Sequence, residues 1–571
     1  MRKGNKMNFL EFKYQRPDKD EVLTRLQELL HQFEQAEDYA AFFNTFQQFI
    51  ELEKHFQTQM QLANIRHSID TRDEFYTQEC DYFDVISPIV DNAIHAIDQV
   101  ILNSPYRQQL ENDVPKTWFM IHEFNQKVMS EAIIEDLQEE NKLASRYQNV
   151  IASAQIDFND EVHTLASIEK YMSDPDRNMR KQAHKAYWGW FADHEQEIGD
   201  IFDQLVQVRT KIANKMGYET FTPFGYLRML RLDYDRYDVE QYRQNVLEDV
   251  VPVAMELYQA QAKRHGYEGP TLPAWDEKIT FESGNPQPKY DEPELVRRAL
   301  QMYRELSEQT GIFFEGMVDQ NLMDLNAKPG KAAGGYCEIL PDYGVPFIFA
   351  NFNGTNADIE TLTHEAGHGF QAWLSRNAFP YDLVWPTNES AEIDSMGMEF
   401  LTWPWMELFF EEDTAKYYYT HLEGAVKFLG YGVLVDHFQH EVYDHPTWNH
   451  DQRMACWREL EQQYLPQKDY QDIDVLERGG WWMRQLHIFM MPFYYIDYTL
   501  AQVVALQIWS RMQRHDETVF DDYVAMAKCG GTKTFKELVT ISKNIVPFEK
   551  GCLKQTMQDV KAWFEAHDVE E

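Results

Sequence analysis

Apolar residues recur at steps of three and four along most of this chain, which is the spacing of one face of an α-helix. Val22, Leu26, Leu29 and Phe33 show the pattern near the start. It continues through four long, glycine-poor stretches, at 36–66, 86–102, 116–150 and 176–216. We therefore expect a mostly α protein in which residues 1–200 form an N-terminal helical lobe.

Strand-like sequence is concentrated in one short region. Residues 336–340 and 346–351 are rich in β-branched and aromatic side chains, and Pro341 to Gly344 between them supply a turn. Proline cannot donate to a sheet ladder, so Pro346 suits the start of an edge strand. We expect one small β-sheet beside the helix that follows it.

That helix carries the pentapeptide His-Glu-Ala-Gly-His at 364–368, an HExxH motif. Residues four apart lie on the same helix face, so His364 and His368 can bind one metal ion. A catalytic zinc site takes three protein ligands and keeps a fourth position for water. Glu365 lies beside that position and can accept a proton from the water. The motif predicts metal-dependent hydrolysis, most often of peptides.

A third protein ligand is needed, and the next predicted helix offers acids. Glu389, Glu392 and Glu399 all lie on it, after a turn-rich stretch from Pro380 to Asn388. Glu399 shares the face of Glu392 and could accept the second N–H of a ligand histidine. Spacing alone leaves the third ligand open among the three acids, and solvated acids on a surface helix fit equally well.

A second group of histidines resembles a metal site less closely. The residues concerned are His437, His440, Glu441, His445 and His450. His440 and His445 are five apart, which rotates the second imidazole off the face of the first. Pro446 disfavours helix at His445. We interpret this group as a helix end with satisfied or solvated histidines.

Hydrolysis of a peptide bond also needs donors for an oxyanion. The segment 487–498 offers His487, Tyr494 and Tyr498, with Pro492 suited to the first turn of a helix. Without other information, such a segment is more typical of aromatic packing than of catalysis.

Composition narrows the possible partners and the compartment. The 571 residues include 94 acidic and 53 basic side chains, a formal charge of −41. Such a charge opposes binding to nucleic acid or to an anionic membrane. No stretch approaches 18 consecutive apolar residues, and no apolar segment follows the basic residues 1–6, so we expect neither a membrane span nor a secretory signal. Five cysteines without a CxxC motif favour free thiols in a reducing, cytoplasmic compartment.

Several ordered motifs resemble one family. They are TLTHEAGHGFQ at 361–371, AEIDSMGMEF at 391–400, PFIFANFNG at 346–354, HIFMMPFYYIDY at 487–498 and GGTKTFKELVTISKNIVPFEKG at 530–551. Together they are similar to the oligoendopeptidase F group of the thimet oligopeptidase family of zinc metallopeptidases. The resemblance implies two helical lobes enclosing a deep substrate channel, with a catalytic domain over 201–571.

The resemblance also implies residue roles. One Zn²⁺ per chain would be bound by His364, His368 and Glu392, with Glu399 supporting a ligand histidine and Glu365 as general base. His487 and Tyr498 would stabilise the oxyanion, assisted by Tyr494 or Tyr495. A substrate strand would add to the strand near Phe347 to Asn351, a known mode of peptide recognition. The residues expected to contact substrate are Gly335, Tyr336, Phe347, Phe349, Asn351 and Tyr495.

We therefore expect a zinc-dependent endopeptidase that hydrolyses short unfolded oligopeptides. A zinc carboxypeptidase or dipeptidyl carboxypeptidase on a similar channel fold is one alternative. Another is a non-catalytic helical binding protein with a structural zinc, although such a site does not require Glu365. The sequence leaves open whether the protein is a monomer or a homodimer and whether the native metal is Zn, Co or Mn.

Overall fold

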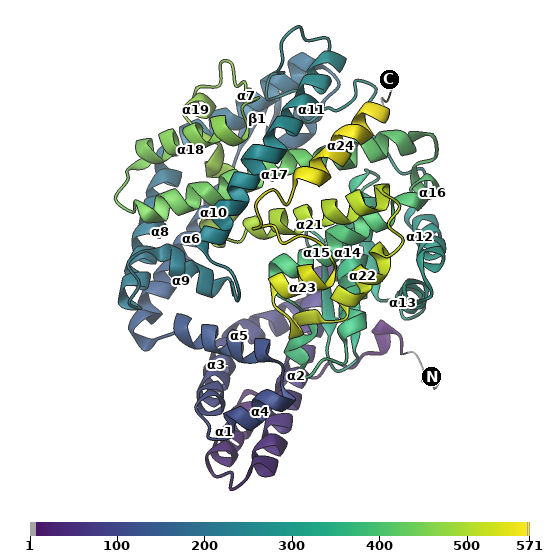
Figure 1. Ribbon diagram of the computed structural model, residues 1–571. Coiled ribbons are helices and arrows are strands. Elements are labelled where there is room, and N and C mark those ends of the chain that lie inside the picture. Colours follow the sequence, from purple (N-terminus) through teal and green to yellow (C-terminus); the bar gives the residue numbers. More distant parts are fainter. Residues whose placement is uncertain (1–6, 568, 570–571) are drawn as a thin grey trace. The chain divides into compact units, whose positions relative to one another are not determined.

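The structure is a computed structural model that describes residues 7–567 and 569, so the basic residues 1–6 lie outside the described part. Helices dominate it, which confirms the predicted mostly α class (Figure 1). The chain forms two compact units. Unit 1 comprises Met1–Gln126, Pro286–Thr414 and Arg511–Asn544, and unit 2 comprises Lys127–Asn285, Ala415–Ser510 and Ile545–Glu571. The units interleave along the chain, and neither coincides with the predicted ranges 1–200 and 201–571.

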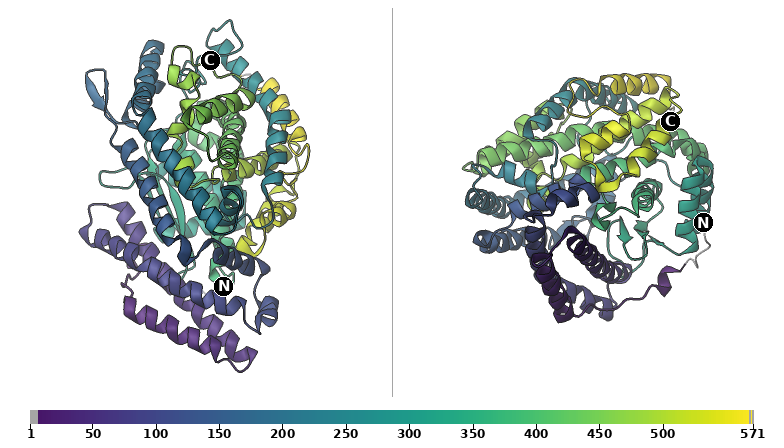
Figure 2. Two further views of the ribbon diagram at one scale, coloured as in Figure 1. Left: turned by 90° about the vertical axis from the view of Figure 1, so that its left-hand side faces the viewer. Right: turned by 60° about the horizontal axis from the view of Figure 1, so that its bottom comes forward.

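Unit 1 contains the first helices of the chain and the helix that carries the HExxH motif. Its helices are α1 (Lys19–Glu34), α2 (Tyr39–Ile69), α3 (Glu74–Leu102), α4 (Arg107–Asp113), α5 (Lys116–Val128), α12 (Glu292–Leu306), α13 (Glu308–Asp319), α14 (Ala357–Ser375), α15 (Asn388–Leu401), α16 (Glu407–Phe410), α22 (Val519–Ala527) and α23 (Phe535–Ile541). Helices α1, α2 and α3 pack side by side, as both views of Figure 2 show. Their shared core is made of aromatic and aliphatic side chains such as Phe46, Phe49 and Trp118.

Helix α3 is more apolar than we expected from the sequence. By length and composition alone it could cross a membrane. Its most apolar 18-residue window has a mean hydropathy of 1.3, and 33% of that window is buried. The sequence argument counted only uninterrupted apolar runs, and Asp91 and Asp98 interrupt this one. One such helix is weak evidence for a membrane span, because packed helices of soluble proteins pass the same test.

The small sheet of unit 1 has three strands. They are β3 (Met323–Asn326), β4 (Tyr336–Leu340) and β5 (Val345–Phe352), in the order β3-β5-β4. Strands β4 and β5 are antiparallel and match the two predicted strands, while β3 runs parallel to β5 and was not predicted. The prediction of an edge strand at Pro346 was wrong, because β5 is central. Strand β3 pairs with β5 only from Ile348 onward, so Pro346 has a strand partner on one side only.

Helix α14 follows the sheet and packs on β5 and on α15. A turn precedes it: Gly354 has φ +88°, and the Asp358 carboxylate accepts the N–H groups of Asn353 and Gly354 at 2.9 and 2.7 Å. Asn356 occupies the N-cap position, but its side chain makes no capping hydrogen bond.

Gly367 explains how closely α14 approaches α15. A Cβ atom there would lie 2.5 Å from the Asp394 carbonyl oxygen and 2.7 Å from the Ser395 Cα. Both are backbone atoms, which cannot rotate away. The glycine inside the helix is therefore required by packing, despite its cost in helix propensity.

Unit 2 is built from helices and a two-stranded ladder. Its elements are α6 (Ile134–Ala152), β1 (Ile156–Phe158), β2 (Glu161–His163), α7 (Arg177–Asp193), α8 (Glu195–Lys215), α9 (Phe221–Arg228), α10 (Arg236–Asn245), α11 (Val251–Arg264), α17 (Thr414–Asp444), α18 (His450–Tyr464), α19 (Asp474–Glu477), α20 (Leu486–Met490), α21 (Ile496–Gln513) and α24 (Lys554–Ala566). Helix α17 ends at Asp444, two residues before Pro446, as predicted.

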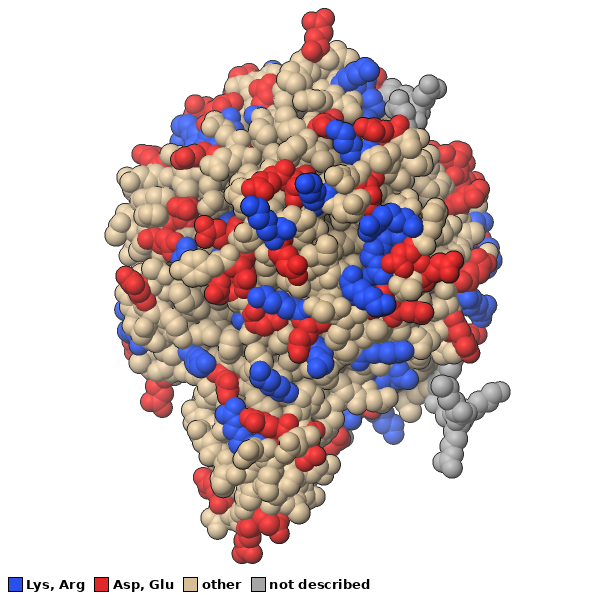
Figure 3. All heavy atoms as spheres, in the orientation of Figure 1, with Lys and Arg blue, Asp and Glu red and all other residues tan. Residues whose placement is uncertain are grey.

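On the face drawn in Figure 3, lysine and arginine side chains intermingle with aspartates and glutamates.

Candidate active site

The HExxH histidines and one acid of the next helix form a compact cluster in unit 1. His364 and His368 extend from α14 and Glu392 from α15, and their ligand atoms all lie within 4.8 Å of one another. Glu392 Oε2 is 3.2 Å from His364 Nε2 and 3.6 Å from His368 Nε2. Tetrahedral zinc with bonds of about 2.0–2.1 Å separates its ligand atoms by roughly 3.3–3.4 Å. The three side chains therefore fit a zinc ion, and no other such group occurs in the part of the chain that the structure describes.

Neighbouring groups orient two of these three side chains. Glu399 Oε1 lies 2.7 Å from His364 Nδ1, so the other ring nitrogen is left to bind metal. The Ser395 hydroxyl donates to Glu392 Oε2 at 3.0 Å. His368 Nδ1 is buried without a hydrogen-bond partner among the described residues. The choice among three acids is thereby resolved in geometric terms: Glu392 joins the cluster, Glu399 contacts the imidazole behind it, and Glu389 is buried outside the cluster.

The electrostatics of the cluster suit a base next to a cation site. Burial raises the pKa of Glu365 to about 7. Burial also opposes ionisation of Glu392, but its contacts with His364 and His368 hold its pKa at about 2. Burial lowers the pKa of His368 to about 4, which keeps that ring neutral and available as a ligand.

The sheet residues predicted to contact substrate take different positions. Gly335 lies against the catalytic helix, since a Cβ there would be 3.6 Å from Glu365 Oε1. Asn351 donates to the carbonyl oxygens of Ala332 and Gly334, both at 2.8 Å, and so holds the glycine-rich loop. Tyr336 stacks on Phe349 with ring centroids 4.9 Å apart.

Two of the predicted substrate residues are core residues instead. Phe347 and Phe349 are 1% and 0% exposed and offer no side-chain surface to a peptide. They lie two residues apart on β5 and so point to the same face of the sheet, and Ile348 and Ala350 on the opposite face are buried as well. Strand addition to β5 is also contradicted, because this strand already has β3 and β4 as neighbours.

Unit 2 brings the predicted oxyanion residues together. The His487 ring lies parallel to that of Tyr494, at 5.7 Å, and at steep angles to Tyr495 and Tyr498, at 5.0 and 6.0 Å. Tyr498 also contacts both other tyrosines edge-on. The structure therefore collects the predicted catalytic residues into two clusters, one in each unit.

Buried side chains hold the backbone of this segment. Arg209 donates to the carbonyl oxygens of Ile488 and Phe489 at 3.2 and 2.5 Å. Arg231 donates to the carbonyl oxygen of Phe493 at 2.8 Å, and Gln439 accepts the Phe493 N–H at 2.9 Å. Phe493 has φ +69°, a left-handed conformation that is uncommon for a bulky residue and is stabilised by these bonds.

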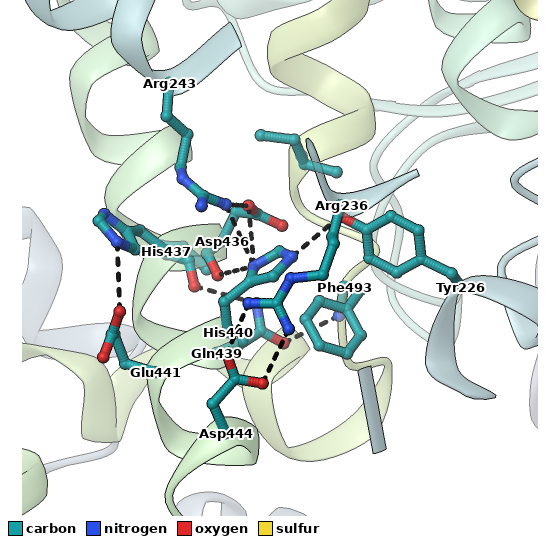
Figure 4. A network of polar contacts seen from close by, with 12 residues as sticks. Tyr226, Arg236, Arg243, Asp436, His437, Gln439, His440, Glu441, Asp444 and Phe493 are labelled. Carbon is teal, nitrogen blue, oxygen red and sulfur yellow. Dashed lines mark hydrogen bonds and ion pairs between the residues drawn. The ribbon is translucent and has the colours of Figure 1, made fainter. Parts of the chain in front are cut away.

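The second histidine group belongs to this supporting network (Figure 4). His440 Nε2 lies 2.9 Å from the Tyr226 hydroxyl, and its Nδ1 lies 2.9 Å from the Asp436 carbonyl oxygen. Arg243 donates to the Asp436 carboxylate at 2.9 Å. The remaining histidines contact Tyr464, the Glu441 carbonyl and Glu195. Each of these histidines has a hydrogen-bond partner through at least one ring nitrogen, and none belongs to a metal-ligand cluster among the described residues.

Comparisons with known proteins agree with this geometry. Residues 170–557 match Peptidase family M3, and residues 9–129 match the Peptidase M3 N-terminal domain. The chain belongs to peptidase family M3. It is a peptide hydrolase, which excludes the non-catalytic alternative.

Individual relatives support the same conclusion. A structure of PZ peptidase A with an inhibitor is 44% identical, with a TM-score of 0.89 and coverage of 98% of this chain and 99% of that one. A proposed oligoendopeptidase F from Bacillus anthracis str. Ames is 43% identical, with a TM-score of 0.85 and 99% coverage of both chains. An oligoendopeptidase F homologue of Borreliella burgdorferi is 21% identical over 429 residues, which are 71% of this chain and 69% of that protein.

Proposed function

We propose that this M3 peptidase is a zinc-dependent endopeptidase that hydrolyses short unfolded oligopeptides. The observation that carries the proposal is the cluster of His364, His368 and Glu392, with ligand-atom separations that suit tetrahedral zinc. A zinc ion bound there would supply Lewis acidity, which activates water and polarises a peptide carbonyl near neutral pH.

Glu365 serves as the general base. It neighbours the ligand His364 on α14, and burial raises the pKa of its carboxyl group to about 7. A base with such a pKa can accept a proton from water and return it to the leaving amine without a large energetic penalty for either transfer.

His487 and Tyr498 serve as hydrogen-bond donors to the oxyanion. This assignment rests on the motif resemblance at 487–498 and is supported by the contacts that group both rings with Tyr494 and Tyr495. Removal of one such donor typically lowers kcat by about 10²–10³-fold.

We also propose that an extended substrate pairs with β4 rather than with β5. Strand β4 is an edge strand, and it begins directly after Gly335, whose backbone lies against Glu365. Backbone pairing at a sheet edge recognises a peptide without requiring a particular side chain. It also requires an unfolded substrate, since a folded protein does not present an isolated strand.

A cytoplasmic location is proposed on the state of the cysteines. All five are free, and burial raises the pKa of Cys337 well above its usual value, so this thiol is unreactive. Free thiols are typical of a reducing compartment.

Cleavage of a matched peptide pair tests the endopeptidase assignment. One peptide has a free C-terminal carboxylate and the other a C-terminal amide, and products are identified by mass spectrometry with added zinc or with chelator. An endopeptidase cuts both peptides internally and is inhibited by the chelator. Cleavage confined to the free-carboxylate peptide, near its C-terminus, would instead support the carboxypeptidase alternative.

A further inference from the structure

Gln485 connects the predicted oxyanion histidine to a partly buried tyrosine through two hydrogen bonds. It lies between the 3₁₀ helix Gly480–Arg484 and α20, where its backbone N–H donates to the Trp482 carbonyl oxygen at 2.9 Å. Its side-chain oxygen accepts from the hydroxyl of Tyr431, on α17, at 2.5 Å. Its side-chain nitrogen lies 2.8 Å from His487 Nδ1. The amide thus has one contact at each end.

The Tyr431 hydroxyl determines the orientation of this amide. Burial raises the pKa of Tyr431, so the hydroxyl keeps its proton and needs an acceptor. Gln485 Oε1 provides that acceptor at 2.5 Å. The indole N–H of the neighbouring Trp481 can only donate and could not take its place.

The reversed amide would not satisfy the same groups. Its nitrogen would donate to the Tyr431 oxygen. The proton of this partly buried hydroxyl would then have no acceptor among the described residues, and a polar group that loses its partner is destabilising. The orientation in the structure is the one that satisfies the whole chain of bonds.

The direction of these hydrogen bonds determines which ring nitrogen of His487 carries the proton. Gln485 Nε2 is a donor only, so His487 Nδ1 accepts and carries no proton. In a neutral imidazole the proton is then on Nε2. Burial lowers the pKa of His487, which favours the neutral ring. The Nε2 atom has no hydrogen-bond partner within the described residues, and the ring is partly exposed.

We propose that Gln485 is a positioning residue that holds His487 as the neutral tautomer protonated at Nε2. His487 is then a hydrogen-bond donor at every pH in the working range and not a general base. This inference rests on the proposed function only for the identity of the acceptor, the oxyanion of a peptide under attack. The tautomer itself is a property of unit 2 without substrate.

The tautomer is measured directly by ¹⁵N NMR of histidine-labelled full-length protein at pH 8. The His487 signals are assigned as those absent from His487→Gln. We expect Nδ1 at the shift of an unprotonated nitrogen and Nε2 at that of a protonated one. A wild-type His487 protonated on Nδ1 would overturn the proposal, whether or not the protein cleaves peptides.

The variant Gln485→Glu reverses the direction of the hydrogen bond to His487 with almost no change in side-chain shape. A carboxylate only accepts, so His487 Nδ1 must carry a proton, and Nε2 keeps one only while the ring is an imidazolium. We expect kcat relative to wild type to fall by about 10²-fold as pH rises from 6 to 9, the loss typical of one missing oxyanion donor. KM is expected to change less than about threefold, since such a donor acts mainly in the transition state.

Matched variants separate this effect from charge and folding. Gln204→Glu makes the same change at an exposed position of α8, where the amide donates to the Asp200 carbonyl, and should follow the wild-type pH profile. The ionisable groups that face His487 are Tyr494, Tyr495 and Tyr498, and burial raises the pKa of Tyr495 above its ordinary value. A Gln485→Glu profile parallel to wild type would overturn the proposal. Absence of cleavage by the wild type would overturn the proposed function instead, and the NMR result would still decide the tautomer.

Discussion

The contact between α14 and α15 at Gly367 makes a quantitative prediction. In Gly367→Ala the new Cβ would lie 2.5 Å from the Asp394 carbonyl oxygen and 2.7 Å from the Ser395 Cα. Alanine gains about 1 kcal/mol over glycine in helix propensity. Overpacking costs about 1–3 kcal/mol, and the upper part of that range applies here because backbone must move. We expect a net loss of roughly 2 kcal/mol in the free energy of unfolding, the difference of these two terms.

The same substitution should weaken metal binding. The two helices carry the three metal ligands, so moving them apart displaces Glu392 from His364 and His368. Metal–ligand distances tolerate changes of only about 0.2 Å, and we expect zinc affinity to fall at least about tenfold. Unfolding is measured by calorimetry, and zinc affinity by competition with a chelator of known affinity.

An exposed glycine provides the control. Gly424 lies inside α17 with nothing within 4 Å of its added Cβ, so Gly424→Ala should gain up to about 1 kcal/mol and leave zinc affinity unchanged. The difference in stability between the two alanine variants isolates the clash. Equal stabilities, or a Gly367→Ala protein with wild-type zinc affinity, would refute the reasoning.

Two further predictions concern the same centre. Glu399→Gln should lower zinc affinity about 10–100-fold, because the carboxylate that orients the His364 ring is lost; unchanged affinity would show that this contact is incidental. The pH dependence of kcat/KM should show an acid limb, because Glu365 must be ionised to accept a proton. Burial raises its pKa from 4.5 to about 7 and a bound cation would lower it, so activity should disappear as pH falls through a midpoint between these values. A profile that stays flat down to pH 4 would contradict the assignment of the base.

Local patterns were sufficient for the parts of the fold that local forces control. The helical periodicity, the turn from Pro341 to Gly344 and the strands β4 and β5 were all predictable, because each depends on neighbours within a few residues. The order of strands was not readable. Strand β3 has only four residues of mixed polarity, and its parallel pairing with β5 made a predicted edge strand central.

The same distinction applies to the candidate site. His364, Glu365 and His368 follow from helix geometry alone, whereas spacing could not choose among Glu389, Glu392 and Glu399. That choice depends on how α15 lies against α14, which is determined by the contact at Gly367. The residues that hold the backbone of the 487–498 segment are even more distant in sequence. Arg209 and Arg231 reach its carbonyl groups across 262 to 280 residues, and no local pattern predicts such pairs.

The most direct test of the account measures bound zinc and peptide cleavage together in Glu365→Gln. The amide keeps the shape of the side chain but cannot accept the proton, while the three metal ligands are untouched. We predict one zinc per chain, as in the wild type, with kcat lowered by at least about 10²-fold, the contribution typical of a general base. Cleavage at the wild-type rate, or a wild-type protein that hydrolyses peptides without any metal bound, would contradict the central claim.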